Sequence, residues 1–542
     1  MVLKLKIILL ILLTGIGYAF PDNVLNDRFV AGDKDIDTSI NFDGLLIDSI
    51  VIENRDIYNT SEKRYDNFIF KTANRLHIVT RAAVIRRELL FKVGEPYSAL
   101  LAEEIGRNLR ARYVLYDAWV KPELLTDGTL LVRVITIDQW SLLGGMTIRH
   151  DGDETDYQVG FEEKNFLGYN QLITCDYFFQ ENDDNFFKAS FIDERLGGRP
   201  LYVNVTYSDE PVNRMRQIYL GRPYYNLNQS FSYSLSYTNR GGRRDIYVDD
   251  RKKAQSNYSG DINSFYLSYR WGEYARKIGI NLSYDYHYER TYDRVVFDPA
   301  VNFIFPDDTV YHQLTPGVSL ENLKFIKLRR INGFSYTEDV TLGERFELSW
   351  GRAFKPDFKN HLYDHIILTG SLGAFYRGNL VLVGYNRLIK YRHDKDLRHL
   401  AQFTFRYYNN HYSFFTLAFR GQYLSDWRLE NTSDLIMGGS NTLRGYNKYF
   451  LTGDRMNVFN LEGRFYSDQE ILSVIFGGVV FADWGRTWKA GEPMRIKDYY
   501  WSIGCGLRIS FEKAAKSKIL RIDLALREDK KWEFSIGTGQ YF

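Results

Sequence analysis

Residues 520–527 read LRIDLALR, and this stretch decides the class of fold. Leucine and isoleucine alternate in it with arginine, aspartate and alanine. Successive side chains of a β-strand point to opposite faces, so the stretch is expected to be a strand with one apolar and one polar face. Residues 501–511, WSIGCGLRISF, alternate in the same way. Such strands fit a sandwich that faces water on one side, or a membrane barrel that is apolar outside and polar inside.

The composition and the N-terminus favour the barrel. Aromatic residues make up 16% of the 542 residues, while the net charge is only +2 and gives no support to nucleic-acid binding. Short alternating segments follow one another from residue 141 to residue 542. We count between about sixteen and twenty candidate strands, and predict an antiparallel transmembrane barrel of about sixteen over residues 141–542.

The first nineteen residues have the pattern of a secretory signal peptide. Lys4 and Lys6 precede the apolar run 7–16, and small residues follow at 17–19. Residues 20–44 are polar and are interpreted as a linker. The longest later apolar run is much shorter than the ~20 residues of a membrane helix. We therefore expect an exported chain without a helical anchor.

Residues 45–140 have the pattern of a small α/β domain. A strand near residues 46–52 is followed by an irregular insertion, 54–78, and then by two helices, for which Thr80 and Ser98 are placed as N-caps. Two further strands meet at a hairpin near residues 127–128. This order resembles a POTRA domain, the periplasmic module of outer-membrane assembly and translocation proteins; the alternative is an unrelated small α/β domain. An open sheet of this kind offers an edge to which an extended polypeptide can add.

A glycine-rich stretch, GGSNTLRGY at 438–446, lies between two strand-like segments. Arg444 is its only charged residue, and a guanidinium on a tight loop is expected to have a fixed carboxylate partner. An ordinary surface loop is the alternative. Phe481 and Asp483 fall on one face of a predicted strand. A charge at Asp483 is tolerable in a barrel wall only if that face points into the lumen.

Several motifs in this order resemble the BamA/TamA superfamily of outer-membrane assembly factors and its two-partner-secretion relatives. They are Leu443-Arg444-Gly445-Tyr446, the stretch 480–485 (VFADWG) and the early turn in 162–170 (EEKNFLGYN). The resemblance implies that the loop folds back into the barrel. It also implies that Arg444 pairs with Asp483, with Glu462 nearby.

The last strand of such barrels ends in aromatic residues and serves as a signal for insertion. By resemblance, Phe534, Ile536, Gly537 and Phe542 would form that signal here. The chain departs from the family pattern in having one POTRA-like unit, no plug-like helix and no lipase domain ahead of that unit.

The resemblance implies a protein that helps other polypeptides to insert into or cross the outer membrane, with the POTRA-like domain in the periplasm. Its partners would be unfolded or extended outer-membrane or secreted polypeptides and outer-membrane lipid, with accessory periplasmic proteins as an optional addition. The alternatives are a secretion pore for one partner protein and a hydrolase built on a barrel. Neither G-x-S-x-G nor H-E-x-x-H occurs, and the two cysteines lie far apart. We therefore expect no enzyme activity, no metal and no cofactor.

Overall fold

The structure is a computed structural model of the whole chain. It describes residues 41–542, apart from positions 113, 152–153, 181–183, 249–250, 298–304, 306, 430–434, 440–441, 448–449, 490, 512 and 514–518. The predicted signal peptide and all but the last four residues of the predicted linker lie outside the described residues. In the part of the chain that is described, no helix is long and apolar enough to cross a membrane.

The first described unit is a three-stranded sheet with helices, and we call residues 41–140 the N-terminal module. The central strand β3 pairs in parallel with β1 and antiparallel with β2, so β1 and β2 are the edges. The predicted order of elements is present, with one more helix inside the insertion. The elements are β1 (Ile47–Arg55), α2 (Phe68–Leu76), α3 (Ala82–Arg86), α4 (Ala99–Arg110), β2 (Leu115–Leu124) and β3 (Leu130–Asp138).

The module has its own hydrophobic core, in which the apolar faces of α4 and the sheet meet. Ile105 and Leu109 of α4 are fully buried, as are Val132 and Val134 of β3. Ser98 caps α4 as predicted, because its hydroxyl accepts a hydrogen bond from the backbone N–H of Leu101.

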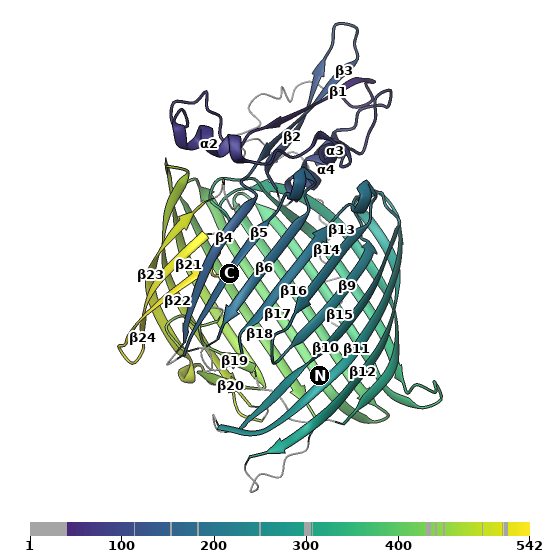
Figure 1. Cartoon of the computed structure of the whole chain (residues 1–542), viewed down its shortest axis with the longest axis vertical. Helices are drawn as coiled ribbons and strands as arrows, with labels where there is room; N and C mark the ends of the chain where they lie inside the picture. The colour runs from purple at the N-terminus through teal and green to yellow at the C-terminus, as the bar shows by residue number, and fades with distance from the viewer. Residues whose placement is uncertain are drawn as a thin grey trace. The chain divides into compact units, whose positions relative to one another are not determined.

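The second unit is a single antiparallel sheet wound into a barrel, with the last strand next to the first (Figure 1). Ladders join consecutive strands, whereas between β25 and β4 the described residues give no extended ladder. The strands are β4 (Leu142–Asp151), β5 (Glu154–Glu163), β6 (Leu172–Phe179), β7 (Phe186–Asp193), β8 (Tyr202–Ser208), β9 (Arg214–Arg222), β10 (Phe231–Val248), β11 (Arg251–Trp271), β12 (Arg276–Val296), β13 (Thr309–Leu328), β14 (Glu338–Phe354), β15 (His361–Tyr376), β16 (Asn379–Arg392), β17 (Lys395–Tyr412), β18 (Phe415–Arg428), β21 (Arg455–Ile471), β22 (Val474–Trp488), β23 (Tyr500–Ser510), β24 (Ile519–Arg527) and β25 (Trp532–Thr538).

The described residues place twenty strands in this sheet, so the predicted count of sixteen is wrong. The first six strands, β4 to β9, have only 7 to 10 residues each, and their alternation is correspondingly weak in the sequence. β10, β11 and β12 have 18 to 21 residues and continue into stretches rich in charge. Arg240 and Arg244 of β10 both pair with Glu289 of β12, so these charges lie on strands.

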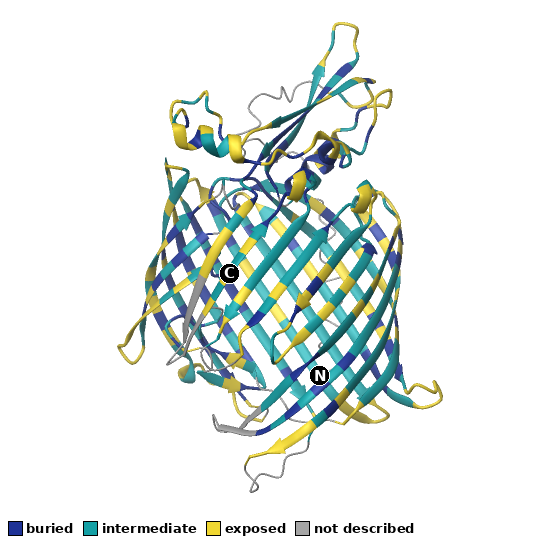
Figure 2. Cartoon of the chain, in the orientation of Figure 1, coloured by how far each residue is buried: buried dark blue, intermediate teal, exposed yellow. Residues whose placement is uncertain are grey.

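The alternation predicted from the sequence is present in the barrel wall (Figure 2). On β23, Trp501, Ile503 and Leu507 are exposed on the outer face, whereas Ser502 and Arg508 are buried. On β24, Leu524 is exposed while Arg521 and Asp523 are buried. The wall is therefore apolar outside and carries charged side chains inside.

The early turn in 162–170, between β5 and β6, contacts the module through hydrogen bonds. Asn165, fully buried, donates hydrogen bonds from its side-chain amide to the Ile78 carbonyl and to the Thr80 hydroxyl. Thr80 is therefore not the predicted helix cap: α3 has Arg81 at its N-cap and no side-chain cap bond. The backbone N–H of Thr80 instead donates to the buried Asp138 carboxyl group at 2.8 Å.

We expect residues 41–140 to fold without the barrel, because their core is complete in itself. Ile105→Asp, which places a carboxylate in that core, should abolish the fold. Leu100→Asp is the matched control on the same helix, since Leu100 is 63% exposed, and this variant should still fold. Circular dichroism and urea titration of the fragment test this, and a wild-type fragment without cooperative unfolding would contradict it.

Asp138 gives the module a pH dependence. Burial raises the pKa of its carboxyl group to about 6. A carboxyl group with a higher pKa in the folded than in the unfolded protein favours folding at low pH, and loses this contribution as the pH rises from about 4 to 6. Asp138→Asn should therefore gain stability relative to wild type between pH 4 and pH 7, measured by urea titration of the full chain. A difference that is constant with pH would mean that Asp138 folds as the carboxylate.

Candidate functional site

The loop that carries Arg444 lies between β18 and β21. Two short strands, one on each side of the Arg444 segment, pair with each other as a small hairpin. The hairpin consists of β19 (Leu435–Met437) and β20 (Leu451–Gly453). Ser440 and Asn441 of the glycine-rich stretch lie outside the described residues. Leu443 and Tyr446 are both buried and form a hydrophobic cluster with Met437, Met456 and Val458.

The backbone of this loop requires glycine at two positions. Gly438 has a φ of +131°, and a Cβ there would lie 1.9 Å from the carbonyl oxygen of Asn447. Gly445 has a φ of +84°, and a Cβ there would lie 3.0 Å from the Cβ of Ala525 in β24. These glycines let the loop turn sharply and come close to the barrel wall, which brings Arg444 to the lumen face of β22.

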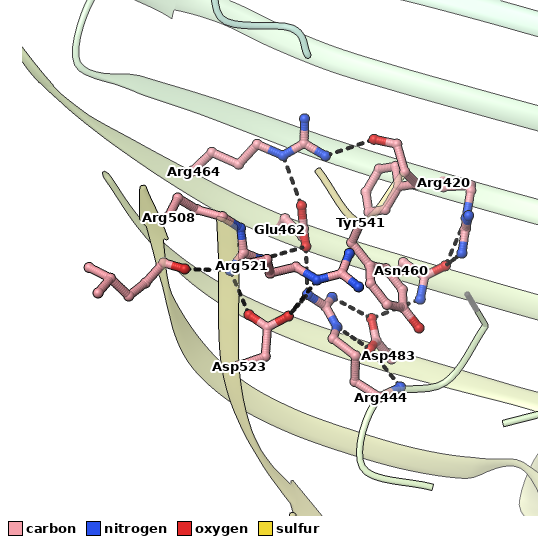
Figure 3. A network of polar contacts seen from close by, with 12 residues as sticks. Arg420, Arg444, Asn460, Glu462, Arg464, Asp483, Arg508, Arg521, Asp523 and Tyr541 are labelled. Carbon is pink, nitrogen blue, oxygen red and sulfur yellow. Dashed lines mark hydrogen bonds and ion pairs between the residues drawn. The ribbon is translucent and has the colours of Figure 1, made fainter. Parts of the chain in front are cut away.

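Arg444 makes the carboxylate contacts that the motif implied (Figure 3). Its Nε and Nη2 donate to the two oxygens of Asp483 at 2.7 and 2.8 Å, in a bidentate pair. Its Nη1 donates to Oε1 of Glu462 at 2.6 Å. The side chain of Arg444 is 1% exposed, and both carboxylate side chains are fully buried. The arginine is thus held by charge and by fork geometry away from water.

Two aromatic rings lie against the Arg444 guanidinium. Its carbon Cζ is 3.6 Å from the ring centre of Phe481 and 4.0 Å from that of Tyr541. Phe481 belongs to β22, and Tyr541 lies beyond the end of β25. The guanidinium is therefore in contact with the π-faces of two residues from different parts of the wall, an arrangement that adds to its attraction.

The lumen face of β21 extends the network through every second residue. The Asn460 side-chain amide donates to Asp483 and to the backbone oxygen of Thr442, and its own oxygen accepts from Arg420. Glu462 also accepts a hydrogen bond from Nε of Arg464 at 2.8 Å.

A third carboxylate, Asp523 of β24, completes the cluster. It accepts from Nη1 of Arg508 at 2.6 Å and pairs with Arg521 at 3.2 Å. The cluster, which we call the lumen network, thus contains more guanidinium groups than carboxylates. Its charged members are Arg420, Arg444, Arg464, Arg508, Arg521, Glu462, Asp483 and Asp523.

Main-chain oxygens accept further hydrogen bonds from the arginines of the network. Arg464 donates from Nη1 to the backbone oxygen of Ile331 and from Nη2 to that of Phe542, at 2.7 and 2.9 Å. Ile331 belongs to the turn 329–337 between β13 and β14. Buried Glu338 accepts hydrogen bonds from the backbone N–H groups of Ile331, Asn332 and Gly333 and so fixes that turn.

The same turn contacts the N-terminal module. The Thr337 hydroxyl donates to Asp117 of β2 at 2.8 Å. Next to it, Arg110 of α4 makes a bidentate pair with Asp339 at 2.6 and 2.7 Å. A continuous series of contacts therefore leads from the module through turn 329–337 and Arg464 to Glu462 and Arg444.

The residues predicted for a C-terminal signal lie in two different environments. Phe534 and Ile536 of β25 are each 63% exposed on the outer face, and Gly537 packs beside Arg521. Phe542 packs inside the barrel against Leu328, Ile331 and Leu380.

Sequence reasoning did not find Arg420, Asn460, Arg464, Arg508, Asp523 or Tyr541. A usable signal was present for some of them. Asn460, Glu462 and Arg464 recur at every second position, and so do Arg521 and Asp523, on the faces of strands whose other faces are apolar.

A scan against protein-family models and a search of curated proteins find no match. Solved structures with similar architecture are CdiB from Escherichia coli and CdiB from Acinetobacter baumannii. The first has 11% identity over 95% of this chain and 92% of that chain, with a TM-score of 0.43. The second has 12% identity over 92% and 73%, with a TM-score of 0.42. BamA from Haemophilus ducreyi, lacking POTRA domains 1–3, has 12% identity over 90% and 83%, with a TM-score of 0.36. The resemblance to the BamA/TamA superfamily is carried by the sequence motifs.

The chemistry of the lumen network is electrostatic. Among the described residues, no group of three or more His, Cys, Asp or Glu side chains is placed to hold a metal ion. Cys175 and Cys505 are free cysteines. What the network can do is hold the loop 435–453 against β21, β22 and β24.

Arg444→Ala should release the loop, because it takes the bidentate arginine partner from buried Asp483 and one of the close arginine partners from buried Glu462, at a cost of about 3–5 kcal/mol. Asp483→Asn should have the same effect. The double variant should be little worse than either single one, as expected for residues that share one interaction. Arg444→Lys should rescue only in part, since lysine lacks the fork. Protease cleavage within 435–453 and the heat-dependent gel mobility of the folded barrel measure these effects.

Arg352→Ala is the matched control, because the Arg352–Asp364 pair is a bidentate pair in the same wall with Arg352 42% exposed. Arg352 reaches solvent, and Asp364 also contacts His361, so loss of this pair should cost about 1 kcal/mol or less and the variant should stay close to wild type. Strict additivity of the Arg444 and Asp483 effects would show that the two residues do not act together.

Proposed function

We propose that this protein resides in the outer membrane and helps other polypeptides to insert into that membrane or to cross it. The observation that carries the proposal is the Arg444 loop, which is pinned inside the barrel by Asp483 and Glu462 next to the strands where the two ends of the sheet meet. No covalent chemistry is needed, because the barrel and the module act by binding.

The outer face of the barrel supports the membrane location. Ile278 and Ile280 of β12, Val480 of β22 and Leu235 of β10 are all about half exposed on that face. A wall of this composition in water would leave a large apolar surface without a partner. In a bilayer the same surface is matched by lipid.

The N-terminal module supplies a capture site for extended chains, and we assign it the POTRA role in the periplasm. Its edge strand β2 is bonded to β3 on one side only. The first half of β2 is already engaged in contacts, since Asp117 accepts a hydrogen bond from Thr337 and the carbonyl of Ala118 accepts one from Arg110. The segment 119–124 is therefore the part of β2 along which a polypeptide in extended form would add as a further strand.

Depletion of the protein, followed by quantitative proteomics of outer membrane and medium, tests the function. Loss of many outer-membrane proteins is expected, with rescue by wild type and not by Arg444→Ala. Loss of a single secreted protein would favour the alternative, a dedicated secretion pore. Unchanged proteomes would refute both.

A photo-crosslinking residue at Lys121 tests the capture site. Lys121 lies in segment 119–124, so the residue should trap unfolded outer-membrane polypeptides. The matched control is Arg133 of the central strand β3. It lies opposite Lys121 in the β2–β3 ladder, and a crosslinker there should trap no polypeptide. Equal capture at the two positions would argue against binding along the edge.

A further inference from the structure

Helix α2 of the module presents an apolar face that no described residue covers. Phe68 is 82% exposed, Ile69 60% and Leu76 67%, while Phe70 and His77 on the opposite side are buried (Figure 2). Positions 68, 69, 72 and 76 fall on one side of α2. The helix is therefore apolar on two sides, and among the described residues only the inner side has a partner.

The inner side attaches the helix to the rim of the barrel. Tyr58, Tyr65 and Phe70 form one aromatic cluster, with Trp140 packed against it just before β4. The Tyr65 hydroxyl donates to Glu470 at 2.7 Å, and the Tyr58 hydroxyl contacts Ser473 at 3.2 Å. Phe68 follows Tyr65 by three residues, at most about 10 Å of chain. The first turn of α2 thus lies close to the turn between β21 and β22.

That turn is where the apolar outer band of the barrel reaches the rim. Along β21 the outward residues Leu461 and Phe465 are exposed, and Ile471 and Leu472 at the turn are 57% and 66% exposed. The uncovered face of α2 is therefore close to a lipid-facing surface and extends it beyond the strand ends.

The charges on α2 suit the same environment. The helix contains Lys71 and Arg75, both exposed, and no acidic residue, although Lys71 forms an exposed ion pair with Asp66 just before the helix. A short helix with one apolar face and basic side chains beside it favours the boundary between headgroups and acyl chains. Anionic headgroups add to this preference through the two cations.

We propose that the exposed face of α2 binds the lipid leaflet next to the barrel rim. Phe68, Ile69 and Leu76 would enter the headgroup–acyl boundary, and Lys71 and Arg75 would contact lipid phosphates. The site lies between β4 and the β21–β22 turn, so it holds the module to the membrane beside the two ends of the sheet. The inference depends on the proposed function only for the membrane location of the barrel.

The test uses the full chain with Cys175 and Cys505 replaced by alanine, in nanodiscs of phosphatidylethanolamine and phosphatidylglycerol. Spin labels are placed singly at Ile69, Leu76, Leu124 and Val480. Collision with oxygen and with a water-soluble nickel chelate reports whether each label is in lipid or in water. Labels at Ile69 and Leu76 should favour oxygen as the Val480 label does. Leu124 is 54% exposed at the far end of β2 and should favour the nickel chelate.

Each outcome decides one point. Lipid contact at Val480 together with water at Ile69 and Leu76 would overturn the α2 site and leave the membrane barrel intact. Water contact at Val480 would refute the membrane location itself. Protection of Ile69 only after an unfolded polypeptide is added, or only as protein concentration rises in detergent, would assign the face to a polypeptide or to a second copy and overturn the lipid proposal.

A charge substitution provides an independent readout. Ile69→Asp should raise the rate of trypsin cleavage at Lys71 and Arg75 in nanodiscs several-fold, because a carboxylate at the boundary is unfavourable. Leu124→Asp should leave that rate unchanged. An equal rate in wild type and Ile69→Asp, with both folded by gel mobility, would contradict lipid binding by α2.

Discussion

The guanidinium of Arg444 is the group on which the interior of this barrel depends. It is bound by two carboxylates from neighbouring strands and lies against two aromatic rings. A buried ion pair is a poor source of net stability, since desolvation offsets much of the attraction. Its value here is positional: a bidentate pair fixes distance and orientation together. Removing the arginine would leave buried Asp483 without this bidentate partner, while Glu462 would keep Arg464.

The network also explains why turn 329–337 is ordered inside the barrel. Three N–H groups of the turn donate to the single carboxylate of Glu338, and Arg464 donates to the backbone oxygen of Ile331 in the same turn. Phe334 then packs against Tyr466 at a centroid distance of 5.0 Å. Thr337 and Asp339 contact the module, and the turn is connected through Arg464 and Glu462 to Arg444 of the loop. Coupling between them requires no contact between the module and the loop.

The sequence predicted what alternation and motif spacing determine. The two faces of residues 501–511 and 520–527, and the inward position of Asp483, follow from a period of two and from the cost of a charge facing lipid. That Asp483 pairs with Arg444 was implied by the family motif. The strand count did not follow, because β4 to β9 are too short to alternate clearly. The inward position of Tyr541 and the docking of Tyr65 on Glu470 join residues far apart in the chain, and no local pattern encodes such pairs.

The interior contacts of Tyr541 and Phe542 bear on the meeting point of β25 and β4. β25 is held in the sheet by its seven-residue ladder to β24, and it lies next to β4 in the strand order. The residues just beyond β25 are held from inside, by the Tyr541 ring on Arg444 and by Arg464 on the Phe542 backbone oxygen. Both arginines share Glu462, and a change that displaces Arg444 removes a contact of Tyr541 as well. Release of the loop would therefore also remove a contact of the segment that follows β25.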